Sequence, residues 1–160
     1  MDRLPPIVAC LALLAGCASY SGTGLKPGVA TEQDVRAAMG RPALEFARED
    51  GGHTLAYPRG PLGTQTYMVD VGRDGRLAAI RPVLEDETFW RIQPGMTREE
   101  ILHLLGPPGD SMAYALSGND SWEWRYMDTW GYLADFSVTF NRDGIVVGKF
   151  SRRIDRDRSP

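Results

Sequence analysis

The chain has 160 residues, of which 42% are hydrophobic and 24% are charged, and its formal net charge is −3. A chain of this length forms one medium-sized domain or two small ones. The slightly acidic balance argues against recognition of a nucleic acid through bulk charge, because phosphate backbones attract basic proteins. We therefore expect no nucleic-acid partner.

Residues 1–16 predict a cleavable bacterial signal peptide. Arg3 precedes an apolar run at 7–15, which suits a secretory signal but is too short to cross a bilayer, since that takes about 20 apolar residues. The sequence Leu13-Leu14-Ala15-Gly16-Cys17 then resembles a lipobox, the cleavage motif of bacterial lipoproteins. This resemblance implies cleavage between Gly16 and Cys17 and attachment of lipid to Cys17.

The residues around the lipobox-like motif extend this expectation. Ala18-Ser19, with no aspartate after the cysteine, resembles the sorting signal of outer-membrane lipoproteins. The resemblance implies an outer-membrane protein whose partner is membrane lipid, bound through acylated Cys17, and whose body lies in the periplasm. Cys10 lies in the signal and Cys17 carries the lipid, so we expect no disulfide. Residues 17–24, rich in Ser and Gly, predict a flexible tether.

The remaining chain repeats itself, which predicts an internal duplication. Lys26-Pro27-Gly28 and Gln93-Pro94-Gly95 open two parallel segments, and matched pairs follow at a nearly constant offset: Thr31 with Thr97, Val35 with Ile101, Gly40 with Gly106, Tyr57 with Tyr126 and Val69 with Val138. We place the first repeat at 25–83 and the second at 92–152. A linker at 84–91, with a solvated Glu85-Asp86-Glu87 run, separates them, and a disordered tail follows at 153–160.

Each repeat begins with helix signals. Thr97 and Glu100 form a capping box, in which each side chain satisfies a backbone N–H of the other residue, and Thr31 with Asp34 forms a weaker version. Apolar residues then recur at i, i+3 and i+4, as on one face of a helix. Gly40 and Gly106 mark the helix ends.

The pattern then changes to the period of two that is typical of strands. Alternation is clearest at 132–140 and 65–71, and Asp-Gly pairs at 74–75 and 143–144 predict hairpin turns. Earlier strand pairs are predicted at 43–48 with 53–57, and at 111–116 with 121–126. The predicted fold class is α+β, with two tandem repeats of a helix plus an antiparallel meander, set side by side so that each buries the edge of the other.

The second repeat resembles the SmpA/OmlA domain of BamE-type lipoproteins. The resemblance rests on Gly95-Met96-Thr97, Leu105-Gly106 with Pro108, Trp124-Arg125-Tyr126, and Phe140-Asn141 with Gly144. The first repeat matches this pattern less closely, with Gly28-Val29-Ala30-Thr31 in place of Gly-Met-Thr and Val71-Gly72 in place of Phe-Asn. The resemblance implies a non-catalytic outer-membrane lipoprotein that acts as a scaffold or assembly factor in the envelope. Its protein partner would be an envelope protein, with the outer-membrane assembly machinery as one candidate.

The tandem arrangement also resembles the β-lactamase inhibitory protein, which is built from two helix-and-sheet units. This second resemblance implies an alternative function, in which the chain is a binding or inhibitor module against an exported enzyme. Lipid attachment at Cys17 separates the two hypotheses, because a soluble inhibitor has no use for an anchor.

Few residues suggest catalysis. The chain has two histidines, His53 and His103, which without a free cysteine do not make a usual zinc site. Nucleophile and nucleotide motifs are missing from the sequence. We therefore expect no enzyme activity, no catalytic residue, no metal and no cofactor.

Aromatic residues are the better candidates for binding, because Trp and Tyr are favoured anchors of protein interfaces. All four tryptophans lie between residues 90 and 130. Trp122, Trp124 and Tyr126 share one face of a predicted strand, which indicates a core stripe packed on the helix. Trp90, Trp130 and Tyr132, in the predicted linker and a loop, are the candidate partner-binding residues.

Overall fold

Both predicted helices begin at complete capping boxes. The computed structural model describes residues 21–59 and 63–154, so the predicted signal and Cys17 lie outside the described residues. Thr31 and Thr97 each accept a hydrogen bond from the backbone N–H three residues further on, and the side chain at that position accepts one in return. These caps start α1 (Glu32–Met39) and α3 (Arg98–Leu105), because they satisfy N–H groups that have no partner within the helix.

The first repeat forms an antiparallel meander whose strands pair in sequence order. Its strands are β1 (Leu44–Ala47), β2 (His53–Pro58), β3 (Thr66–Val71) and β4 (Leu77–Pro82). One face of this first sheet packs on α1, and the core there contains Val35 and Met39 from the helix with Leu55, Val69 and Val71 from the sheet. These residues are the stripe and the alternation that the sequence predicts.

The second repeat has the same plan. Its strands, again paired in sequence order, are β5 (Asp110–Tyr114), β6 (Asn119–Met127), β7 (Leu133–Phe140) and β8 (Val146–Arg153). Trp124 pairs with Phe136 and Tyr126 with Ala134 across β6 and β7, and this face packs on α3. The predicted α+β fold with two helix-plus-meander repeats is therefore confirmed.

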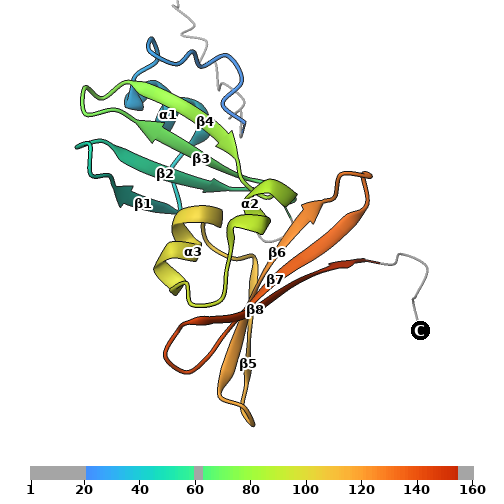
Figure 1. Ribbon diagram of the computed structural model, residues 1–160. Coiled ribbons are helices and arrows are strands. Elements are labelled where there is room, and N and C mark those ends of the chain that lie inside the picture. The colour runs from blue at the N-terminus through green and yellow to red at the C-terminus, as the bar shows by residue number, and fades with distance from the viewer. Residues whose placement is uncertain (1–20, 60–62, 155–160) are drawn as a thin grey trace, which may run out of the picture.

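The repeats stack instead of joining at their edges. The two four-stranded sheets are separate, and α3 lies between them (Figure 1). Ala56 and Met68, on the face of the first sheet that points away from α1, belong to the same core cluster as Ile101 and Leu105 of α3. The order of layers is therefore α1, first sheet, α3, second sheet. The side-by-side arrangement expected from the sequence is corrected, because α3 buries residues on both sheets.

Gly106 shows how closely the two repeats approach. This residue ends α3 with a φ of +72°, and a Cβ added there would lie 2.9 Å from Cγ2 of Thr66 and 3.6 Å from Cβ of Ala56. A side chain would therefore meet both the strain of the left-handed region and the surface of the first sheet. Glycine is needed at this position for the turn and for the contact between repeats.

The expected linker at 84–91 contains a helix, α2 (Asp86–Arg91). Phe89 is buried and stacks on Phe136, with ring centroids 3.9 Å apart. Lys149 of β8 donates hydrogen bonds from Nζ to the carbonyl oxygens of Phe89, Trp90 and Ile92, at the end of α2. Glu85 and Glu87 are exposed, as expected. The buried Phe89 side chain makes this segment part of the core.

Both ends of the described chain are more ordered than composition predicts. Within the expected tether, Gly22 is buried, and a Cβ added there would lie 2.5 Å from Cδ1 of Ile80. At the other end, β8 continues to Arg153, whose guanidinium pairs with Asp128 at 2.6 Å. Residue 153 therefore belongs to the second sheet and not to a tail. Within residues 21–59 and 63–154, none of the helices has the length and apolar character that crossing a membrane requires.

Candidate interaction surface

Asp128 shapes the loop between β6 and β7, which carries two of the candidate binding residues. Its carboxylate accepts hydrogen bonds from the backbone N–H groups of Trp130, at 2.9 Å, and Tyr132, at 2.8 Å. Arg153 of β8 donates to the same carboxylate at 2.6 Å. The backbone of Asp128 also bonds to Gly131 and Tyr132. One carboxylate therefore binds both the backbone of the loop and the end of β8.

The electrostatics of the loop favour the ionised form of Asp128. Desolvation of the carboxyl opposes ionisation, but the hydrogen bonds from Tyr132, Arg153 and Trp130 outweigh it and hold the pKa of Asp128 below its ordinary value. Hydrogen bonds and a nearby cation stabilise the charged form of a carboxyl group. The loop is therefore held most firmly when Asp128 is charged.

The aromatic side chains of this loop point into solvent. Trp130 is 77% exposed and Tyr132 is 58% exposed. The Arg153 guanidinium lies over the Tyr132 ring, 4.6 Å from its centroid, a cation–π contact that restrains the ring. A loop with a fixed backbone and exposed aromatic rings loses little conformational freedom on binding. The exposure expected of Trp130 is confirmed, and Tyr132, at the start of the alternating segment, is exposed as well.

Trp90 is also exposed, at 73%, but it lies on α2. Its carbonyl oxygen accepts a hydrogen bond from Lys149 Nζ at 3.3 Å, so its backbone is fixed to the second sheet. No side-chain contact joins Trp90 to Trp130 or Tyr132 in the part of the chain that the structure describes. The structure therefore groups two of the three candidates on one loop and places the third on a separate element.

The other tryptophans form the core stripe that the sequence predicts. Trp124 is 2% exposed, and its indole Nε1 donates to the carbonyl oxygens of Gly106 and Pro107 at 3.3 and 3.1 Å. Trp122 is partly buried against the same core and contacts Phe140, with ring centroids 4.8 Å apart. The Trp124 indole therefore holds the second sheet on the end of α3.

The face of the second sheet that points away from α3, here called the outer face, is a surface that the sequence analysis missed. Met112, at 60% exposure, and the exposed Phe150 lie on it, and they line a hollow with Asp110, Ser111, Tyr114, Ser121, Glu123, Ser137 and Arg152. Met112 of β5 and Phe150 of β8, which line this hollow, come from opposite edges of the sheet. Alternation in either strand predicts an outward side chain, but only the sheet order brings the two together.

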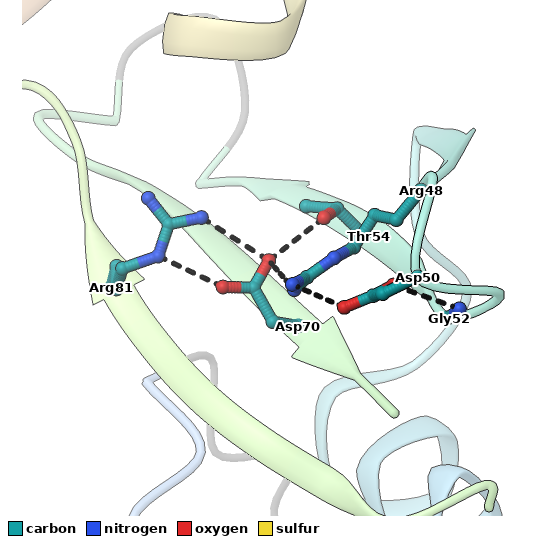
Figure 2. A network of polar contacts seen from close by, with 6 residues as sticks. All are labelled: Arg48, Asp50, Gly52, Thr54, Asp70 and Arg81. Carbon is teal, nitrogen blue, oxygen red and sulfur yellow. Dashed lines mark hydrogen bonds and ion pairs between the residues drawn. The ribbon is translucent and has the colours of Figure 1, made fainter. Parts of the chain in front are cut away.

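Asp70 forms the centre of the largest polar cluster on the first sheet (Figure 2). Its carboxylate accepts hydrogen bonds from Thr54, at 2.7 Å, and from two nitrogens of Arg81, and Arg48 lies 3.4 Å away. Arg48 also pairs with Asp50 at 2.7 Å. Each carboxylate therefore has a cationic partner, as a largely buried charge requires. Thr54 and Asp70 lie on the same face of the first sheet as Ala56 and Met68. We assign this cluster a structural role, because it joins β2, β3 and β4 on that face.

The two histidines lie apart and have separate contacts. His53 Nε2 is 3.0 Å from Glu32, and the His103 ring lies against Phe46, with centroids 4.0 Å apart. His103 is exposed and also joins α3 to β1. Within residues 21–59 and 63–154, no three His, Cys, Asp or Glu side chains are grouped so that they could hold a metal ion. Gly16 and Cys17 lie outside the described residues.

Solved structures to which this chain is similar include the following two. One is a protein assigned as the osmotically inducible lipoprotein OsmE, with 20% identity, a TM-score of 0.37, and coverage of 41% of this chain and 75% of that one. The other is YjgB, a DUF4309 family protein from Bacillus subtilis, with 17% identity, a TM-score of 0.33, and coverage of 82% and 84%. No protein-family model and no curated protein matches the chain. At these TM-scores, neither likeness bears on what the chain does.

Proposed function

We propose that this chain is a non-catalytic lipoprotein of the bacterial outer membrane, held by acylated Cys17, with its body in the periplasm. The observation that carries the proposal is the sequence Leu13-Leu14-Ala15-Gly16-Cys17 after a short apolar run. Several acyl chains on one cysteine anchor a protein stably, whereas one chain binds only marginally. The folded body begins within a few residues of this motif, so the anchor would hold it close to the membrane surface.

The second part of the proposal is that the body acts as a scaffold or assembly factor by binding an envelope protein through the β6–β7 loop. The support is the exposure of Trp130 and Tyr132 on a backbone that Asp128 and Arg153 fix. Large aromatic side chains supply much of the free energy of protein interfaces. A loop that is already ordered loses less entropy when it binds. The loop therefore has the chemistry of an interface anchor.

Replacement of Cys17 tests the anchor. We expect Cys17→Ala to leave an unprocessed precursor that takes up no labelled fatty acid, since Cys17 supplies the sulfur at the cleavage site. Cys10→Ala is the matched control, because Cys10 is the other cysteine of the chain and lies inside the expected signal. It should be processed and labelled like the wild type. Equal labelling of the Cys17→Ala variant and the wild type would contradict the lipoprotein proposal.

Replacement of Trp130 tests the binding surface. We expect Trp130→Ala to reduce recovery of the envelope partner from cross-linked cells, by an amount that corresponds to about 2 kcal/mol or more of binding free energy at a hot spot. Val29 is the control, because it is also an exposed apolar residue but lies in the first repeat. Val29→Ala should leave recovery unchanged. Equal recovery with both variants would place the interface elsewhere.

A further inference from the structure

The two sheets have four edge strands, and three of them are protected against pairing with another chain. The start of β4 is bonded to the segment before α1, through Gly28 N–H to Leu77 O and Leu77 N–H to Ala30 O, each at 2.8 Å. Its other end carries Arg81-Pro82, and both a charge and a proline disfavour the addition of a strand. This edge is therefore blocked at both ends.

The edges at β8 and β1 are protected in similar ways. Val146, at the start of β8, bonds to the segment before α3 through Gly95 and Met96, and charged residues follow at Lys149, Arg152 and Arg153. The β1 edge is four residues long, and its Glu45 pairs with Arg36 of α1 at 3.0 Å. Short strands and charged side chains are common means of blocking an edge.

The β5 edge is the least protected of the four. Its one charged residue, Asp110, stands at the first position of the strand, residues 111–116 carry no charge and no proline, and every residue of β5 is exposed. Among the described residues, only β6 pairs with β5. In Figure 1 the β5–β6 hairpin extends beyond the helices, so none of them lies beside this edge. An exposed edge strand with few charges presents unpaired N–H and C=O groups that pair readily with another strand.

We propose that the β5 edge pairs antiparallel with the β5 edge of a second copy of this chain, centred on Met112. This proposal does not depend on the proposed function. Antiparallel pairing about Met112 places Asp110 of one copy opposite Tyr114 of the other and Ser111 opposite Ala113. No like charges then face each other, which matters because directly opposed like charges destabilise a sheet. The two second sheets would form one continuous eight-stranded sheet.

The side chains of β5 suit this arrangement on both faces. Ser111 and Ala113 are small and point to the same side as Trp122, which pairs with Ser111, so they leave room for the neighbouring copy. Met112 and Tyr114 lie on the outer face, where the two copies would bring their exposed side chains together. The pairing would bury apolar surface beside the hollow that Phe150 lines.

Cysteine substitution at the centre of the pairing tests the proposal in the full chain. Met112→Cys should give a disulfide-linked dimer on mild oxidation in cells. Directly opposite residues have Cβ atoms about 4.5–5.5 Å apart, close to the roughly 3.5–4.5 Å that a disulfide requires. The wild-type chain, oxidised in parallel, gives the background from Cys10 and Cys17. Met112 is exposed, so its replacement leaves the core intact.

Leu116 is the matched control, because it lies at the tip of the same hairpin and is fully exposed. In the proposed register the two Leu116 residues lie eight positions apart along the strands, or about 26 Å at about 3.3 Å per residue. Leu116→Cys should therefore give only the wild-type background. The wild-type chain should sediment as a dimer, whereas Met112→Lys, which places two cations opposite each other, should sediment as a monomer.

Dimer formation by Met112→Cys above background, with loss of the native dimer in Met112→Lys, would support the pairing. Equal cross-linking of Met112→Cys and Leu116→Cys would indicate random collision and overturn it. A Met112→Cys chain that forms no dimer would also overturn it. A Met112→Cys adduct with a different polypeptide, and none at twice the mass of the chain, would assign the edge to another partner and exclude the second copy.

Discussion

Replacement of Trp124 and Trp130 gives a quantitative test of which tryptophans hold the fold. Trp124 is 2% exposed and bonds through its indole to the carbonyl oxygens that follow α3. Trp124→Ala should leave a cavity between the second sheet and α3. Substitutions of this kind in a core typically cost about 3–5 kcal/mol. For a domain of this size, about 2–4 °C is lost per kcal/mol, so we expect Tm to fall by about 6–20 °C.

Trp130→Ala is the comparison, because it removes an equally large side chain that is exposed. The backbone N–H that bonds to Asp128 remains in the variant, and exposed substitutions usually change stability by less than about 0.5 kcal/mol. Its Tm should therefore stay within about 2 °C of the wild type. Thermal unfolding followed by circular dichroism measures both values. A drop in Trp130→Ala as large as that in Trp124→Ala would refute the assignment of these residues to loop and core.

The remaining predictions concern the shared core and the pH dependence of the β6–β7 loop. The full chain should unfold in one transition, because Met68 of the first sheet packs in the core of the second repeat. Met68→Ala should lower the free energy of unfolding by about 2–5 kcal/mol and move that single transition to a lower temperature. Two resolved transitions in a melting curve would show that the repeats unfold independently. Asp128 has a lowered pKa in the folded chain, so its stabilising effect is present above its unfolded value and lost as the pH falls through its folded pKa. Asp128→Asn should therefore lower Tm at neutral pH, and the Tm of the variant should approach that of the wild type as the pH falls well below 3.8. A Tm difference that is independent of pH would contradict the stabilising role of the charged Asp128 carboxylate.

Local signals in the sequence determined the elements of each repeat. A threonine followed three residues later by Asp or Glu starts α1 and α3, and Gly40 and Gly106 end them, because caps and turns depend on neighbouring residues. Alternation likewise determined which side chains of β6 and β7 face α3, since side chains of a strand point to opposite faces in turn. It did not reveal that Asp135 and Ser137, on the other face of β7, are buried as well. The core role of Trp124 and the exposure of Trp130 follow from these local rules.

Only the tertiary structure decided how the repeats combine and which surfaces remain open. The position of α3 between two sheets depends on contacts such as Phe46 with His103, more than fifty residues apart in the chain. The carboxylate of Asp128 fixes the β6–β7 loop through Arg153, which composition assigns to the tail. Neither contact leaves a periodic signal in the sequence, because long-range packing selects partners by shape and charge and not by spacing. For the same reason, the open β5 edge is visible only once the other three edges are seen to be protected.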